Sequence, residues 1–122
     1  MSYNTKNHKD LDIWKMSMDL ATFLYQIANS LPSEEKYGMI SQIKRAAVSV
    51  PINIAEGAGR GTTGSFIQFL NYAQGSLSEI ETQLELCLRL GYLEKIDNIQ
   101  GDIITIRRKI RNLIQVLEAK LP

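Results

Sequence analysis

The chain has 122 residues, of which 44% are hydrophobic and 22% are charged, and its formal net charge is +1. These values are typical of one globular domain, and they exclude a second domain of ordinary size and a strong overall field for nucleic acid or membranes. No apolar run of about 18 residues is present, and the N-terminal sequence lacks the apolar core of a signal peptide. Because Cys87 is the only cysteine, no internal disulfide can form, and we expect a cytoplasmic protein without a membrane partner.

A polar tail and a first helix are expected at the start of the chain. Residues 1–10 are polar, and we expect them to form a flexible tail before a single domain over residues 11–122. Apolar residues then recur at helical spacing and stop at Leu31, which precedes a proline, so the pattern predicts a helix over residues 11–31. Its two apolar stripes are Trp14, Met18, Ala21, Tyr25 and Ala28, and Ile13, Leu20, Leu24, Ile27 and Leu31.

The next segment predicts a second helix over residues 34–57. Ser33 is a suitable N-cap, because the two glutamates that follow it would lie at the positive end of the helix dipole. Pro51 lies inside this helix, where it removes one backbone hydrogen bond and should bend the axis. The glycine-rich residues 57–61 are expected to end the helix.

Two further helices follow. Thr62 or Thr63 is expected to cap the third helix, and Gly91 to end it. Asp97 and Gln100 have the spacing of a capping box, which predicts the start of the fourth helix. The apolar seams of these two helices are Phe66, Leu70, Ala73, Leu77, Ile80, Leu84 and Leu88, and Ile99, Ile103, Ile106, Ile110, Leu113 and Leu117.

Four amphipathic helices with short connections, and no strand signal, predict an all-α fold: an antiparallel up-down four-helix bundle. Further apolar residues lie outside the seams and favour a second buried surface, as in an oligomer. The alternative is that they are ordinary scattered surface residues. They are Val48, Ile52, Tyr72, Leu86 and Val116.

A thin polar arc runs along the second helix opposite its apolar face. The arc comprises Arg45, Ser49, Asn53, Glu56 and Arg60. These side chains either contact a ligand or act structurally, by fixing the helix register and satisfying the backbone around the proline, and we favour the structural role. Arg45 would then pair with Glu56 or with a neighbouring helix.

Residues 59–64 match the dinucleotide fingerprint G-x-G-x-x-G letter for letter. That motif requires a preceding strand, whereas a helix precedes it here, so we expect a flexible turn and no nucleotide site. Arg60, beside the start of the third helix, remains a candidate phosphate contact.

The residues needed for catalysis or metal binding are scarce. His8 is the only histidine and lies in the polar tail, and Cys87 lies on an apolar helix face without a histidine partner. We therefore expect no enzyme, no metal site and no cofactor, with Cys87 as a small buried hydrophobic residue.

A dense basic run lies on the fourth helix and comprises Arg107, Arg108, Lys109 and Arg111. One hypothesis is a face that contacts the phosphates of RNA or DNA and is repeated in each subunit of an oligomer. The alternative is a solvated helix flank that pairs with Glu81 and Glu85. No aromatic residues interleave with these arginines, so base stacking is not indicated.

Four stretches carry a resemblance to a known family. They are L-D-I-W-K (11–15), Y-G-M-I-S-Q-I-K-R-A-A-V-S-V-P-I-N-I-A-E-G (37–57), F-L-N-Y-A-Q-G-S-L-S-E-I-E-T-Q-L (69–84) and L-G-Y-L (90–93). In them the chain resembles the small four-helix-bundle proteins encoded in intervening sequences of 23S ribosomal RNA genes, a family similar to the accessory protein of diversity-generating retroelements. The resemblance implies a homopentamer of bundles in a barrel, no catalysis, and nucleic-acid or reverse-transcriptase binding in the retroelement branch.

One difference favours the intervening-sequence branch. Relatives tend to carry charged residues between the second and third helices, whereas residues 61–65 are neutral here. We expect a non-catalytic homo-oligomer that binds RNA or DNA weakly through the basic residues of the fourth helix. The alternative is a scaffold that recruits an unidentified protein partner and binds no nucleic acid.

Overall fold

A computed structural model describes residues 7–122, and this part of the chain is all-α, without strands. Its four long helices are α1 (Asp12–Asn29), α2 (Met39–Gly59), α3 (Thr63–Arg89) and α4 (Asp97–Glu118). Two short 3-10 turns, η1 (His8–Asp10) and η2 (Ser33–Glu35), precede α1 and α2. The prediction of an all-α chain with four helices is thereby confirmed. None of the described helices combines the length and the hydropathy that crossing a bilayer requires.

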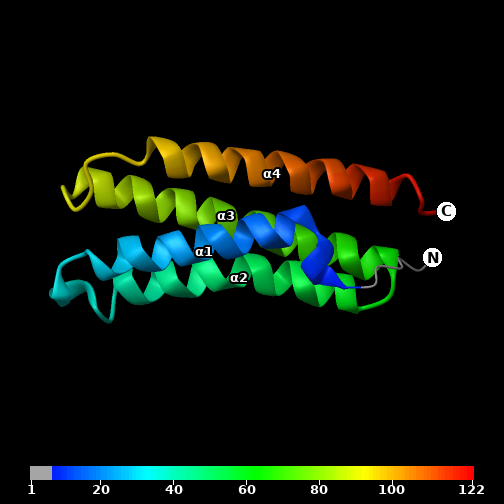
Figure 1. Cartoon of the computed structure of the whole chain (residues 1–122), viewed down its shortest axis with the longest axis horizontal. Helices are drawn as coiled ribbons and strands as arrows, with labels where there is room; N and C mark the ends of the chain where they lie inside the picture. The colour runs from blue at the N-terminus through cyan, green and yellow to red at the C-terminus, as the bar shows by residue number, and fades with distance from the viewer. Residues whose placement is uncertain (1–6) are drawn as a thin grey trace.

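The four helices lie side by side, and each runs opposite to the one before it (Figure 1). α1 packs against α2 and α4, and α3 packs against the same two helices. The α2–α3 interface is the most extensive and the α1–α4 interface the least extensive of the four. The bundle therefore has four sides, each formed by two neighbouring helices.

The core follows the predicted seams closely. Apolar side chains of all four helices form one buried cluster, in which Phe66, Leu24 and Ile110 are fully buried. Leu88 and Leu113, at the ends of their seams, are only half-buried. The pattern of alternating three- and four-residue spacings therefore identified the inner faces of α3 and α4.

The first helix differs from its prediction on one face. The stripe with Leu20 and Leu24 faces the core, but Met18 and Tyr25 of the other stripe are exposed on the α2 side of α1. Periodicity identifies an apolar face without showing which neighbour covers it, and the described residues leave Met18 42% and Tyr25 38% exposed.

The predicted start of the second helix at residue 34 is wrong, because α2 begins at Met39. Residues 33–35 form the separate turn η2, and the Ser33 side chain makes no capping bond. The Glu35 carboxylate performs this role instead: one oxygen accepts the backbone N–H of Met39 at 3.3 Å, and the other accepts the Tyr92 hydroxyl at 3.0 Å. The cap is therefore fixed by a tertiary contact with the α3–α4 connection.

The two later helix starts had different outcomes. The Thr62 side chain accepts the backbone N–H of Ser65 at 3.2 Å, so the predicted cap of α3 is confirmed. The predicted capping box at Asp97 is wrong, because the N-cap residue of α4 is Ile96, which forms no side-chain capping bond. Ile96 is buried, so apolar packing fixes this start without a polar cap.

The polar tail predicted over residues 1–10 lies partly outside the described residues, which begin at residue 7. Within the described part, η1 packs against α1 and α2, and the His8 ring meets the Trp14 ring edge-on at 5.2 Å.

The close approach of α2 and α3 depends on Gly57. A Cβ atom at this position would lie 2.8 Å from Cβ of Phe69 and 3.0 Å from Cδ1 of Phe66. Both neighbours belong to α3, so the absence of a side chain at Gly57 allows the two backbones to meet.

We expect Gly57→Ala to lower the free energy of unfolding by about 1–3 kcal/mol, because the new methyl group overpacks the α2–α3 interface. Gly75→Ala is the matched control, since its Cβ would meet no atom within 4 Å, and it should stabilise the helix by about 0.5–1 kcal/mol. Urea unfolding of both variants measures the two changes. Equal stability of Gly57→Ala and the wild type would contradict the proposed close packing.

Candidate functional site

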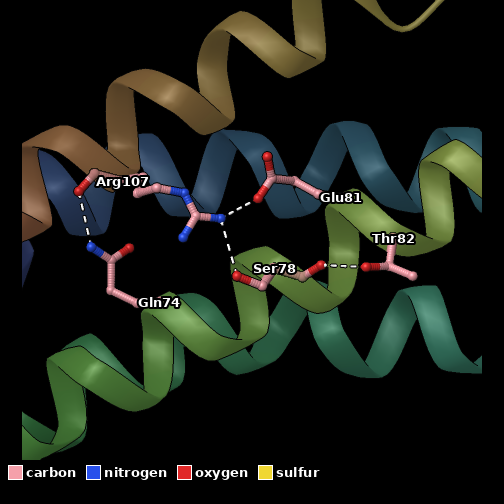
Figure 2. Close-up of polar contacts among 5 residues, drawn as sticks. All are labelled: Gln74, Ser78, Glu81, Thr82 and Arg107. Carbon is pink, nitrogen blue, oxygen red and sulfur yellow. Dashed lines mark hydrogen bonds and ion pairs between the residues drawn. The ribbon is translucent and has the colours of Figure 1, made fainter.

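Arg107 of α4 is turned toward α3 and fastens the two helices together (Figure 2). Its guanidinium forms an ion pair with Glu81 and donates to the Ser78 hydroxyl at 3.3 Å. Its backbone carbonyl accepts the side-chain amide of Gln74 at 3.0 Å. The Thr82 hydroxyl in turn donates to the Ser78 carbonyl at 3.0 Å. Arg107 therefore holds α4 against α3, and its contact with a phosphate stays a prediction.

The other basic residues of the run point in different directions. Lys109 is half-buried and lines a small hollow with Asp10 and Asp12 at the start of α1. Arg108 and Arg111 are exposed, and neither forms an ion pair with another described residue. The structure thus divides the four basic residues, and it leaves two guanidinium groups directed to solvent.

The alternative prediction, that the basic run of α4 pairs with Glu81 and Glu85, holds for Arg107 alone. Glu81 is its partner, whereas Glu85 pairs with Arg89 one turn along α3 at 3.1 Å. Helical spacing fixes the second pair, since residues four apart lie on the same face.

The polar arc of α2 separates into two parts. Ser49 and Asn53 are half-buried against α3: the hydroxyls of Ser49 and Ser76 lie 2.7 Å apart, and the Asn53 amide donates to the Ser49 carbonyl at 2.8 Å and hydroxyl at 3.0 Å. Glu56 and Arg60 are exposed and pair with each other at 3.1 Å. The first part therefore links helices, and the second lies on the surface.

The expected pairing of Arg45 with Glu56 is wrong. The two residues are eleven positions apart on one helix, which corresponds to about 16 Å along the axis, whereas Arg60 lies one turn from Glu56. Arg45 is exposed and forms no ion pair within the described residues.

The glycine-rich match at residues 59–64 spans the end of α2 and the start of α3. Gly61 adopts a φ of 82°, a left-handed conformation that allows the sharp turn between the helices. A helix stands where the dinucleotide fingerprint needs a strand, so its geometry differs from that motif.

Arg60 takes part in an exposed aromatic cluster that the sequence patterns did not indicate. Its guanidinium lies over the Phe69 ring at 4.8 Å, and Phe69 meets Tyr72 edge-on at 5.4 Å. The only sequence signal was the three-residue spacing of two aromatic residues on α3. Their proximity to Arg60 depends on the packing of α3 against the end of α2.

A second missed feature is an open apolar groove of about 660 Å³ between α1 and α2. Trp14, Met18 and Tyr25 line it from α1. Val48, Pro51 and Ile52 line it from α2, and Ile52 is 55% exposed. Two of these residues, Val48 and Ile52, belong to the apolar set that favoured an oligomer.

Cys87 is a free, fully buried thiol, as predicted. Burial raises the pKa of this thiol, and the carboxylate of Glu35 adds to the rise. The side chain is therefore protonated at neutral pH and packs as an apolar residue.

The comparisons with known proteins agree with the resemblance seen in the sequence. The family model described as 23S rRNA-intervening sequence protein matches residues 9–112. This range contains all four of the stretches that carried the resemblance. No individual curated protein matches the chain.

We expect Arg107→Ala to lower the free energy of unfolding by about 1–2 kcal/mol, because it leaves Glu81 and Ser78 without their shared partner. Arg108→Ala, the matched control one residue along, should change it by no more than about 0.5 kcal/mol. Urea unfolding of Arg107→Ala, Glu81→Ala and the double variant gives the coupling energy of the pair. A coupling energy of zero would contradict the fastening role of Arg107.

Proposed function

The chain belongs to the 23S rRNA-intervening sequence protein family, and from this premise we propose that it is a non-catalytic, self-assembling protein of the cytoplasm that binds RNA or DNA weakly. Its protomer is an antiparallel up-down four-helix bundle, and several copies, with a pentamer favoured, form a ring. The observation that supports the proposed self-assembly is the apolar groove between α1 and α2. Nucleic-acid binding rests on the two unpaired arginines of α4.

The groove needs a partner because it exposes large apolar side chains to water. Met18 is 42% exposed, Tyr25 38% and Ile52 55%. Burying such side chains contributes about 25 cal/mol per Å² of apolar surface, so covering this face favours association.

A second copy of the chain offers a complementary surface on the side formed by α1 and α4. Phe23 is 47% exposed there and lines a hollow with Asp19 and Asp102. The α2 rim of the groove carries Lys44, whose ammonium lies 5.2 Å from the centre of the Tyr25 ring. An apolar groove with a basic rim thus complements an apolar residue with acidic neighbours.

The positions of these two surfaces favour a closed ring. The groove lies on the α1–α2 side and the Phe23 surface on the α1–α4 side, and these two sides are adjacent because they share α1. If the two surfaces lay on opposite sides of the bundle, successive copies would stack in a straight line. A head-to-tail contact between adjacent sides turns each copy relative to the last, which closes a ring when the rotation matches. The outer surfaces of α3 and α4, with Arg108 and Arg111, remain accessible in this arrangement.

Assembly also strengthens contact with nucleic acid. Two arginines per protomer provide few phosphate contacts, but a ring repeats them in every subunit, so one strand can engage several copies. The net charge of +1 limits the overall attraction, which accounts for weak binding.

We expect Ile52→Glu and Phe23→Glu each to convert the oligomer to monomers, because each places a charge in one half of the interface. Mixing the two variants should give a dimer, since one copy keeps an intact groove and the other an intact Phe23 surface. Light scattering and sedimentation measure the masses.

Leu86→Glu is the matched control, because Leu86 is 45% exposed on α3 outside both surfaces, and it should leave the oligomer intact. A monomeric wild-type protein would refute self-assembly. Monomers in the mixture would refute the head-to-tail arrangement.

We expect the double change of Arg108→Ala and Arg111→Ala to weaken binding to single-stranded RNA. It should also reduce the slope of log K against log salt concentration by about 1.4 per engaged protomer, because each lost phosphate contact contributes about 0.7. Fluorescence anisotropy of a labelled oligonucleotide over a salt series measures both quantities, with RNA and DNA compared.

Arg89→Ala is the control, since Arg89 is exposed but paired with Glu85. If the wild-type protein bound neither RNA nor DNA at low salt, nucleic-acid binding would be refuted. The alternative, a scaffold for another protein, would then be favoured, with the apolar groove as its docking surface.

A further inference from the structure

The aromatic cluster, defined as Arg60, Gln68, Phe69 and Tyr72, lies where the end of α2 meets the first turns of α3. The Tyr72 ring is 50% exposed, although it has partners on one side. Its edge meets Phe69 at 5.4 Å with an interplanar angle of 82°, and its hydroxyl accepts the Gln68 amide at 2.8 Å. The ring is therefore held in one orientation while half of its surface faces solvent.

Arg60 is fixed on the other side of Phe69. Its guanidinium lies 4.8 Å from the centre of the Phe69 ring, and Glu56 accepts from it at 3.1 Å and 3.3 Å. The close approach at Gly57 brings this part of α2 against Phe69. The exposed Tyr72 ring and the Arg60 guanidinium, on the two sides of Phe69, are therefore both ordered stacking surfaces that lose little conformational entropy on binding.

The aromatic cluster lies at the same level of the bundle as the solvent-directed arginines of α4. Tyr72 lies two residues before Gln74 on α3, and the Gln74 amide donates to the backbone carbonyl of Arg107 at 3.0 Å. Arg108 follows directly along α4. The aromatic ring and the unpaired arginines therefore lie at a similar level on either side of α3, an arrangement that suits a strand with both bases and phosphates.

We propose that Tyr72 stacks against an unpaired base of single-stranded RNA or DNA, with Arg60 on the far side of Phe69 and with Arg108 and Arg111 on the phosphates. This inference rests on the proposed nucleic-acid binding and specifies its ligand as single-stranded. Bases in a duplex are already stacked on their neighbours and present no free face to a protein ring. Base stacking is tolerant of sequence, because every base has an aromatic face.

The test uses the full chain, a labelled adenosine RNA of about 12 nucleotides and inorganic polyphosphate of similar length. We expect Tyr72→Leu, which keeps apolar cover over the helix but removes the ring, to weaken RNA binding about tenfold. Tyr72→Phe keeps the ring and should bind nearly as well as the wild type. Neither variant should change binding to polyphosphate, which has charge but no bases.

Tyr37→Leu is the matched control, because Tyr37 is 89% exposed and lies beside the Lys36 ammonium at 5.5 Å, but has no hydroxyl partner in the described part of the chain. Unchanged RNA affinity in Tyr72→Leu would overturn the inference and leave the proposed function standing. An equal loss with polyphosphate would also overturn it, because the effect would then not concern bases. Absence of both RNA and DNA binding by the wild-type protein at low salt would overturn both proposals.

Discussion

The close contact between α2 and α3 at Gly57 is the constraint on which the rest of the structure depends. A side chain there would collide with Phe66 and Phe69, so the two helices can form the most extensive interface of the bundle only around a glycine. The same approach brings the Ser49 and Ser76 hydroxyls within 2.7 Å and places Arg60 over Phe69. Packing in the core and the candidate contacts on the surface thus have a common origin.

The other two interfaces of functional interest are formed differently. α4 is fastened to α3 by the polar contacts of Arg107 (Figure 2). Arg108 and Arg111 form no ion pair with another described residue. α1 and α2 leave an apolar groove open on their outer side. The proposed assembly and the proposed nucleic-acid contact would therefore use different sides of one bundle.

Several site residues could be chosen from the sequence, but their roles could not. The basic run could be recognised in the sequence, yet only the packing of α4 shows that Arg107 faces Glu81 while Arg108 faces solvent. The polar arc was visible on a helical wheel, yet its division into a half-buried link from Ser49 to Ser76 and a surface pair at Glu56 depends on where α3 covers α2. Tyr72 was noted only as an apolar residue outside the seam.

The sequence by itself determined the four helices, the inner faces of α3 and α4 and the family, because apolar periodicity and the 37–57 stretch are local signals. Tertiary structure decided the start of α2, where Glu35 is held by Tyr92 across the bundle end, and the start of α4, where Ile96 is buried. It also decided which apolar and charged side chains stay exposed. The physical reason is that a residue's own helix fixes its face, whereas burial and pairing depend on neighbours far away in the chain.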